Sequence, residues 1–282
     1  MRILITGAGG MLGLDVGRAA AAAGHEAIPL TRAALDIRDA AAVSAAVAQA
    51  APDAVINCAA WTDVDGAESA FEAALAVNGP GAANVAAAAA AAGAWLIHLS
   101  SDYVFDGRKR TPYVESDATG PLSAYGRSKL EGERAVLAAA GADGCAIVRS
   151  SWLFGAGGRC FPRTIMRLAG ERDRLEVVCD QVGCPTFTGH LAPALVTIAR
   201  ERRAGLLHVA AADSCSWYEL AAETVALCGA DCEVAPIPTE GYPLPAPRPG
   251  YSVLGSDCGA PSLPGWREGL RAFAAQLVEV AA

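Results

Sequence analysis

The stretch Arg2-Ile3-Leu4-Ile5-Thr6-Gly7-Ala8-Gly9-Gly10-Met11-Leu12-Gly13 decides the fold. Its first five residues predict a β-strand, and the alanine-rich segment from residue 12 to 23 predicts a helix. Gly7 permits a sharp turn, Gly10 lets the backbone approach a pyrophosphate, and Gly13 lets the helix pack close to the sheet. Free N–H groups at the start of that helix favour an anion. We therefore expect a dinucleotide to bind at this turn.

The same alternation of short apolar strands and longer helices continues to about residue 150. It predicts strands at 2–6, 27–30, 54–57, 95–99 and 145–149, and helices at 12–23, 40–50, 81–92 and 123–139. This order is typical of an α/β fold with a Rossmann-type, doubly wound parallel sheet. Residues 1–150 would form the cofactor-binding domain, which also carries the catalytic residues.

Beyond residue 150 the pattern loosens, and helices are predicted at 163–170, 191–202, 217–227 and 266–281. We expect residues 151–282 to form a smaller C-terminal substrate-binding lobe. Its segments are expected to interleave with the first domain, with strands that return to the main sheet.

Composition excludes several classes of partner and site. The net charge of the 282 residues is −8, with no concentrated basic face, which argues against nucleic acid. The nine cysteines and four histidines show no zinc spacing, so we expect no metal site and free thiols in a reducing compartment. The N-terminus runs straight into a strand, and no unbroken apolar segment is long enough to span a bilayer. The sequence predicts a cytoplasmic protein that does not interact with membranes.

The end of the second strand indicates which cofactor is used. Leu30-Thr31-Arg32 stands where an NAD-selective enzyme usually carries an acidic residue for the ribose 2′-hydroxyl, and a hydroxyl followed by arginine suits a 2′-phosphate. We expect NADPH, with NADH as the alternative if Arg32 is only a solvated surface residue. Asp36 and Ile37 are placed to contact the adenine.

Tyr125-Gly126-Arg127-Ser128-Lys129 is the most informative catalytic stretch. Residues four apart lie on one helical face, so the Lys129 ammonium is expected beside the Tyr125 phenol. Together with the charge of the oxidised nicotinamide ring, it is expected to lower the pKa of Tyr125 towards working pH. Ser101, at the end of the fourth strand, is placed to hydrogen-bond a substrate carbonyl.

Taken together, these motifs resemble the dTDP-4-dehydrorhamnose reductase family of the extended short-chain dehydrogenases/reductases. The resemblance covers nearly the whole chain. The segments that carry it are Gly7 to Gly13, Asn57 to Asp65 with Glu68-Ser69, Ser100 to Gly107, Pro121 to Lys129, Arg149 to Phe154, Asp180 to Thr186 and Arg248-Pro249.

The resemblance implies that NAD(P)H reduces the 4-keto group of a dTDP-linked 6-deoxyhexulose to give dTDP-L-rhamnose or a related deoxysugar. It implies Ser101, Tyr125 and Lys129 as the catalytic residues, and Asp102 and Trp152 as substrate contacts. The cofactor contacts it implies are Gly10, Met11, Leu12, Asp36, Ile37, Ala59, Ala60 and Trp61.

The chain departs from the family pattern at two of these positions. Ser101 stands where threonine is usual and preserves the hydroxyl, whereas Trp61 replaces a histidine or tyrosine and would reshape the edge of the pocket. Some members form a magnesium-bridged dimer through acidic residues. Asp15 preserves one acid, but the region of Gly189-His190 lacks another, so no such metal is predicted.

Other roles for the substrate-side residues stay open in the sequence. Arg248 is expected to clamp the substrate diphosphate, or else to be a surface arginine. Asp102 could instead cap a turn, Trp152 could be a core aromatic, and Trp217-Tyr218 is interpreted as packing.

Two other functions remain alternatives to this reductase, while a third is disfavoured. The chain could be a non-catalytic NADP(H)-binding regulatory subunit that resembles the beta subunit of methionine adenosyltransferase, or a ketoreductase of another nucleotide deoxysugar. A 4,6-dehydratase is disfavoured because Asp102 is followed by Tyr103, where a dehydratase carries glutamate. The sequence leaves open whether the protein forms a homodimer.

Overall fold

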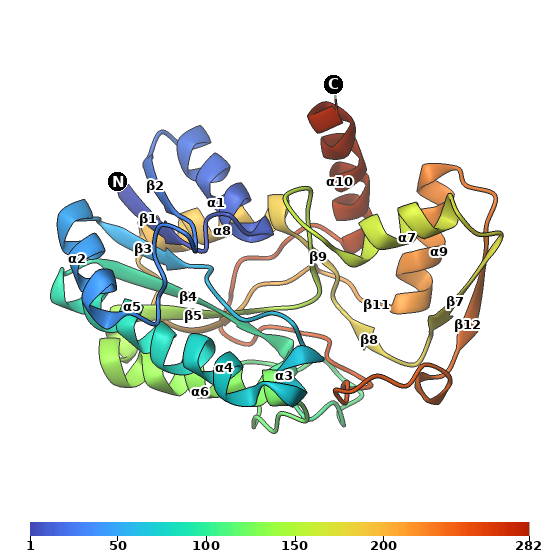
Figure 1. Cartoon of the computed structure of the whole chain (residues 1–282), viewed down its shortest axis with the longest axis horizontal. Coiled ribbons are helices and arrows are strands. Elements are labelled where there is room, and N and C mark those ends of the chain that lie inside the picture. The colour runs from blue at the N-terminus through green and yellow to red at the C-terminus, as the bar shows by residue number, and fades with distance from the viewer. Residues whose placement is uncertain (282) are drawn as a thin grey trace.

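Six parallel strands form the central sheet of the computed structural model, which describes residues 1–281 (Figure 1). In spatial order these strands are β10 (Gly205–His208), β5 (Cys145–Ser150), β4 (Trp95–Ser101), β3 (Ala54–Asn57), β1 (Arg2–Thr6) and β2 (Glu26–Leu30). The chain places β2 on one side of β1 and β3 on the other, so the strand order reverses at β1. Ligands of such sheets bind outside the carboxyl ends of the strands at this reversal.

Helices cover both faces of this sheet, as its alternating side chains require (Figure 1). Ile3 and Ile5 face one layer of helices and Leu4 faces the other. The first layer is formed by α1 (Met11–Ala22) and α8 (Thr188–Glu201), and the second by α2 (Ala40–Ala50), α5 (Ala82–Ala91) and α6 (Ala124–Ala140). The doubly wound α/β fold predicted from the sequence is confirmed.

Short helical segments follow β3, β4 and α6, and the sequence pattern did not predict them. They are α3 (Gly66–Ser69), α4 (Phe71–Ala76), the π-helical turn η1 (Val77–Gly81), and the 3-10 turns η2 (Asp102–Val104) and η3 (Ala142–Gly144). A π-helical turn is rare and occurs often at functional sites.

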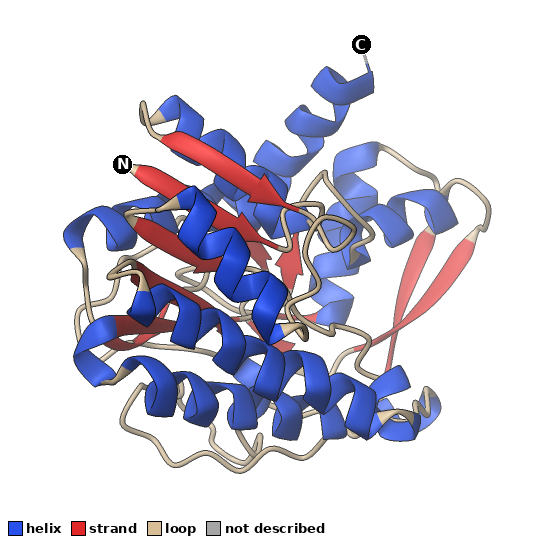
Figure 2. Cartoon of the chain, turned by 60° about the vertical axis from the view of Figure 1, so that its left-hand side comes forward, coloured by secondary structure: helices blue, strands red, loops and turns tan. Residues whose placement is uncertain are grey.

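The C-terminal lobe consists of three pairs of short strands, three helices and a 3-10 turn (Figure 2). The strand pairs are β6 (Leu153–Phe154) with β9 (Thr186–Phe187), β8 (Val182–Gly183) with β11 (Cys215–Ser216), and β7 (Arg174–Val178) with β12 (Glu233–Ile237). The helical segments are α7 (Phe161–Ala169), α9 (Trp217–Cys228), α10 (Trp266–Ala281) and η4 (Thr239–Gly241). The larger of its apolar cores includes the buried aromatic residues Phe154, Phe187, Trp266 and Phe273.

Two C-terminal segments, α8 and β10, belong to the central layers. The boundary near residue 150 stays a prediction. Strand β4 is two residues longer than the sequence indicated, so Ser100 and Ser101 are strand residues. Within residues 1–281, no helix is both long and apolar enough to cross a membrane.

Candidate active site

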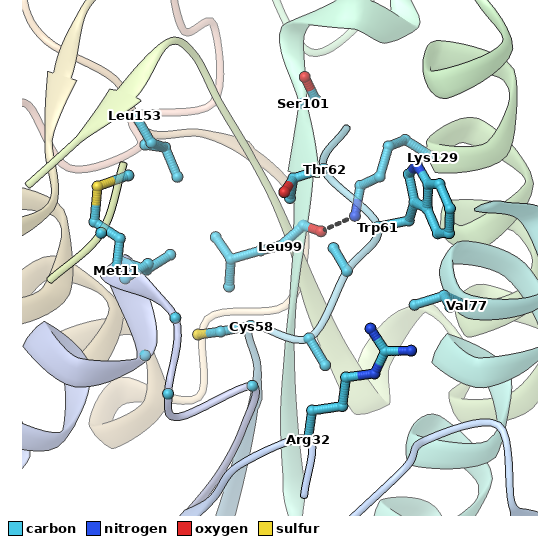
Figure 3. Close-up of a pocket in the computed structure, with 18 of the residues that line it drawn as sticks. Met11, Arg32, Cys58, Trp61, Thr62, Val77, Leu99, Ser101, Lys129 and Leu153 are labelled. Atoms are coloured by element: carbon cyan, nitrogen blue, oxygen red, sulfur yellow. Dashed lines mark hydrogen bonds between the residues drawn. The ribbon is translucent and has the colours of Figure 1, made fainter. Parts of the chain in front are cut away.

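A cavity of about 950 Å³ opens at the carboxyl ends of β1, β3 and β4 (Figure 3). It gathers residues from the glycine turn, the second and third strand ends, α6 and the C-terminal lobe. The sequence-predicted site residues that line it are Gly7, Gly10, Met11, Leu12, Gly13, Arg32, Asp36, Ile37, Ala59, Ala60, Trp61, Ser101, Asp102, Tyr125, Lys129 and Trp152. Of the predicted site residues, Arg248 alone does not line this cavity.

The glycine turn is built as its sequence suggested. Gly7 has a φ of +66°, and a Cβ there would lie 2.6 Å from the Ala59 nitrogen. A Cβ on Gly13 would lie 2.4 Å from the Gly7 carbonyl oxygen, so the first turn of α1 packs directly on the loop. Gly10 caps α1 without a side chain. The N–H groups at the start of this 12-residue helix therefore border the cavity, and the turn fits the pyrophosphate of a dinucleotide.

Asn57 holds the loop that faces this turn. Its Oδ1 accepts hydrogen bonds from Thr6 Oγ1 at 2.6 Å and from the Ala59 nitrogen at 3.2 Å. Its Nδ2 lies 3.1 Å from Nδ1 of His98, which is buried. Burial, and secondarily the charge of Lys129, lowers the pKa of His98 well below its usual value, so this histidine is neutral. A buried polar network thus sets the position of the predicted cofactor contacts Ala59 and Ala60.

Asn78, in η1, anchors the next part of the same loop and was missed by the sequence reasoning. Its Oδ1 accepts from the Trp61 nitrogen at 2.9 Å, and its Nδ2 donates to the Trp61 carbonyl at 3.2 Å. The same Nδ2 lies 2.8 Å from Ser128 Oγ in α6. Asn78 therefore ties the loop that carries Trp61 to the helix that carries Tyr125 and Lys129.

Arg32 and Asp36 border the other end of the cavity. Arg32 is exposed, and its guanidinium points towards the cavity (Figure 3). Asp36 forms a paired contact with Arg38, in which Nη2 lies 2.5 Å from Oδ2. Hydrogen bonds from Arg38 lower the pKa of Asp36 to about 2, although its burial acts in the opposite direction. Arg38 was missed by the sequence reasoning, and a contact between Asp36 and adenine stays a prediction.

Tyr125 and Lys129 lie in the first two turns of α6, which begins after Ser123. The Ser123 hydroxyl accepts a hydrogen bond from the Gly126 nitrogen at 3.1 Å and so fixes the start of this helix. Lys129 is 2% exposed, and its Nζ donates to the Leu99 carbonyl at 2.7 Å (Figure 3). Burial lowers the pKa of Lys129 to about 8. The ammonium is therefore held near the end of β4, the strand that also carries Ser101.

The sequence analysis expected the pKa of Tyr125 to be lowered. The groups of the protein itself raise it, so for these groups the prediction is wrong. Burial raises the pKa of Tyr125 to about 12, while the Ser101 hydroxyl lowers it and the Asp102 charge raises it. The ammonium of Lys129 is directed to the Leu99 carbonyl, and the sequence reasoning had not weighed how strongly burial favours the neutral phenol. Tyr125 is consequently a protonated phenol at neutral pH.

Ser101 and Asp102 are both buried and are joined by a hydrogen bond. Ser101 Oγ donates to Asp102 Oδ1 at 3.0 Å and accepts from the Tyr103 nitrogen at 3.1 Å. Asp102 also accepts from Ser151 Oγ at 3.1 Å, and burial raises its pKa to about 6. The alternative considered from the sequence was that Asp102 caps a turn. In the structure the side chain that caps turn η2 is that of Ser101.

Trp152 and Trp217 form a stacked pair at the side of the cavity nearest the C-terminal lobe. Their ring centroids are 3.5 Å apart, the rings are 3° from parallel, and both residues line the cavity. Trp152 has a φ of +48°, which is unusual for a bulky residue. A Cβ on Gly183 would lie 2.4 Å from its ring, so this glycine makes room for it. The interpretation of Trp217 as packing alone is corrected, because it packs and also lines the cavity.

Arg248 pairs with Asp65 away from the cavity lining. Its Nη1 and Nη2 lie 2.6 and 2.7 Å from the two carboxylate oxygens of Asp65, in a partly buried, bidentate contact. The structure thus satisfies this guanidinium within the protein, and a diphosphate clamp stays a prediction.

Several residues that line the cavity were not singled out from the sequence. They include Cys58, Thr62, Val64, Val77, Leu153 and Arg159. Cys58 follows directly after β3 and Thr62 lies in the loop that continues from it, and this place at the carboxyl end of a central strand is the signal that would have found them.

Asp15 does not gather other metal ligands around it. It is buried in α1, and Oδ2 accepts from Thr188 Oγ1 at 2.5 Å. Within the described part of the chain, no group of three or more histidine, cysteine or acidic residues is arranged to hold a metal. The absence of a metal site stays a prediction.

Comparison with known proteins gives concordant matches over the whole chain. Residues 1–279 match the family model described as RmlD substrate binding domain. dTDP-4-dehydrorhamnose reductase from Mycolicibacterium smegmatis is 46% identical over 285 residues, which cover 98% of this chain and 86% of that protein. dTDP-4-keto-6-deoxy-D-glucose reductase from Streptomyces niveus is 43% identical over 95% of this chain and 90% of its own length.

Solved structures give the same result. A dTDP-4-dehydrorhamnose reductase from Clostridium acetobutylicum superposes with a TM-score of 0.94 at 40% identity, over 99% of this chain and 100% of that one. The Bacillus anthracis protein of that name, solved in complex with NADP, also gives a TM-score of 0.94, at 35% identity over 98% of this chain and 99% of that one. The similarity therefore extends through both the sheet and the C-terminal lobe.

Proposed function

The chain belongs to the dTDP-4-dehydrorhamnose reductase family, and from that premise we propose that it reduces the 4-keto group of a dTDP-linked 6-deoxyhexulose with NADPH. The product would be dTDP-L-rhamnose or a related deoxysugar. The observation that carries the proposal is that Ser101, Tyr125 and Lys129 line the same cavity as the glycine turn. A hydroxyl, a phenol and an ammonium thus stand beside the proposed dinucleotide site.

The proposed cofactor site extends from the start of α1 to Arg32. N–H groups at the α1 terminus suit the pyrophosphate, and the exposed guanidinium of Arg32 suits a 2′-phosphate. The relative from Bacillus anthracis was solved with NADP, which supports the same cofactor here. When bound, NADPH supplies the hydride that reaches the carbonyl carbon.

The protein's own groups then handle the proton. Tyr125 would donate its phenolic proton to the carbonyl oxygen, so one hydride and one proton together convert the ketone to an alcohol. Its raised pKa keeps the phenol protonated before the reaction. The Ser101 hydroxyl, turned from Asp102 to the substrate, would donate to the oxygen where negative charge develops. Lys129, held by the Leu99 carbonyl, would place positive charge beside the phenolate that remains.

Asp102 and the stacked pair of Trp152 and Trp217 would form the substrate side of the cavity. The two indoles offer a flat apolar surface, and the buried Asp102 carboxylate orients the Ser101 hydroxyl. Separate substitution of Trp152 and of Trp217 would test which of the two rings contacts the sugar and which contacts the nucleotide.

The test mixes the protein with NADPH and an enzymatically generated dTDP-4-keto-6-deoxyhexulose and follows absorbance at 340 nm. Oxidation of NADPH that depends on the sugar is the expected result. NADPH binding without oxidation by any keto-sugar would instead favour the regulatory subunit that resembles the beta subunit of methionine adenosyltransferase. NMR of the product sugar would distinguish dTDP-L-rhamnose from the product of another deoxysugar ketoreductase.

Two further expectations belong to this proposal. A cytoplasmic location is supported by nine cysteines that are all free thiols, since disulfides form mainly in oxidising compartments. A homodimer is proposed as the assembly to test, by light scattering of the purified protein after size exclusion.

A further inference from the structure

Glu133 lies on the same face of α6 as the two catalytic side chains. Tyr125, Lys129 and Glu133 follow one another at intervals of four residues, which places them in successive turns of one helical face. Glu133 is 4% exposed, although a carboxylate rarely lies so deep without a specific partner. Neither the motif nor the cavity lining includes it.

Three hydrogen bonds fix the Glu133 carboxylate to the two strands beneath the active site. Oε1 accepts from Ser100 Oγ at 2.5 Å and from Arg149 Nε at 2.8 Å, and Oε2 accepts from Arg149 Nη2 at 2.7 Å. Ser100 belongs to β4 and Arg149 to β5, where they stand opposite each other in the parallel register. Glu133 therefore ties α6 to both strands at one point.

That point adjoins the catalytic groups along the chain. Ser100 directly precedes Ser101 and directly follows Leu99, whose carbonyl accepts the Lys129 ammonium at 2.7 Å. A movement of α6 relative to β4 would thus displace Lys129 and Tyr125 from Ser101. The bidentate contact with Arg149 resists such movement, because paired hydrogen bonds fix orientation as well as distance.

Glu133 also supplies the main charge that favours the charged form of Lys129. The other titratable neighbours are uncharged: burial raises the pKa of Cys58 to about 12 and that of Tyr125 to about 12, and it keeps His98 neutral. Burial by itself would lower the pKa of Lys129 further, and the Glu133 charge acts against it.

The positive charge of Arg149 is shared with other groups. Its Nη1 lies 3.4 Å from His208 Nε2, and its guanidinium lies 5.0 Å from the centre of the Phe105 ring. Arg149 is 3% exposed, so loss of the Glu133 charge would leave two buried cations, Arg149 and Lys129, without their shared anion.

We propose that Glu133 is a positioning residue of the reductase site, which sets α6 against β4 and β5 and supplies the buried negative charge that Lys129 needs. Its partners within the protein are Ser100 and Arg149. The inference rests on the proposed function, but it concerns a group that touches neither substrate nor cofactor.

The variant Glu133→Gln preserves the shape of the side chain and removes its charge. In this variant we expect the alkaline limb of the pH profile of kcat/KM to move down by about one pH unit, because an opposite charge nearby shifts a pKa by roughly 1–3 units. At pH values above the new limb the rate would fall by about tenfold per unit. The pH dependence of NADPH binding, followed by fluorescence titration, should shift in the same direction without any need for turnover.

Glu131→Gln is the matched control, because Glu131 lies on the same helix and is exposed, with Arg134 as its partner at 2.6 Å. It removes the same charge from the surface and should leave both profiles in place. If Glu133→Gln and Glu131→Gln give the same binding and rate profiles, the proposal is overturned. A wild-type protein that binds NADPH but oxidises none would contradict the proposed function, and the binding profiles would still decide the role of Glu133.

The double variant Glu133→Gln/Arg149→Met covers the case in which the single variant does not fold. It removes the pair together, so no buried Arg149 charge is left unpaired, while Lys129 still lacks the Glu133 carboxylate. We expect the double variant to keep the lowered alkaline limb in rate and in NADPH binding. A return of both profiles to wild type would show that Glu133 serves only to neutralise Arg149, and would overturn its role towards Lys129.

Discussion

Gly13→Ala tests whether the contact between the glycine turn and α1 creates the pyrophosphate site. A Cβ at this position would lie 2.4 Å from the Gly7 carbonyl oxygen and 2.7 Å from the Ala8 Cα, whereas ordinary van der Waals contact begins at 3.4 Å. Both obstructing atoms belong to the backbone, so relief requires the loop and the first turn of α1 to separate by about 1 Å. That displacement moves the N–H groups of the first turn away from a bound phosphate.

The size of the effect follows from the hydrogen bonds at stake. A hydrogen bond to a charged acceptor contributes about 1.5–3 kcal/mol, so the loss of one weakens NADPH binding by roughly ten- to a hundredfold. Overpacking should also lower the free energy of unfolding by about 1–3 kcal/mol. Fluorescence titration with NADPH and urea denaturation measure the two quantities.

Gly17→Ala is the matched control on the same helix. A Cβ there would meet only the Ile5 Cδ1 atom, at 3.9 Å, so the substitution fits. It should leave NADPH binding unchanged and raise the free energy of unfolding by about 0.5–1 kcal/mol, since alanine favours a helix over glycine. Equal NADPH affinity in the Gly13→Ala and Gly17→Ala variants would refute the assignment of the glycine turn as the pyrophosphate site.

Three further predictions concern single side chains. Tyr125→Phe should lower kcat by about 10²–10⁴-fold and leave the Kd for NADPH unchanged in titration, because it removes only the general acid; a kcat within a few-fold of wild type would exclude that role. Arg32→Ala should weaken NADPH binding by roughly tenfold or more and leave NADH binding as it is, and a parallel loss for both cofactors would contradict recognition of the 2′-phosphate. The pKa of Asp102 is raised from 3.8 to about 6, so the folded state binds the proton more tightly and loses up to about 3 kcal/mol of stability as pH rises from 4 to 7. Asp102→Asn should lack that loss in urea denaturation across this range, and parallel stability profiles of variant and wild type would show that Asp102 is not strained by burial.

Local patterns predicted much of this fold and the site residues built into it. The strand, glycine turn and helix of residues 2–22 follow from residues close in sequence, and so does the shared helical face of Tyr125 and Lys129. Parallel strands bring their carboxyl ends to one edge, so Ser101 and Ala59 could also be placed near the turn in advance.

Groups that act across distant segments could not be predicted in this way. Trp217 reaches the cavity because α9 begins beside Trp152, and Asn78 holds Trp61 from a π-helical turn that no periodicity indicates. Arg248 pairs with Asp65, which lies 183 residues away in sequence, and no local pattern in the sequence indicates this ion pair.

The protein's own groups shift the pKa of Tyr125 in the direction opposite to the prediction, for a physical reason. The spacing of Tyr125 and Lys129 shows that the two groups are neighbours, but it does not show how deeply each is buried. Burial favours the neutral phenol, the Asp102 charge acts in the same direction, and together they outweigh the hydrogen bond with Ser101; the Lys129 ammonium is engaged by the Leu99 carbonyl.

Transfer of deuterium from NADPH that carries deuterium at both C4 positions of the nicotinamide tests the central claim most directly. With a dTDP-4-keto-6-deoxyhexulose as substrate, the account predicts a product that carries the deuterium at C4 of the sugar, as read by NMR. Deuterium at another carbon of the product, or a product without deuterium although NADPH was consumed, would contradict it.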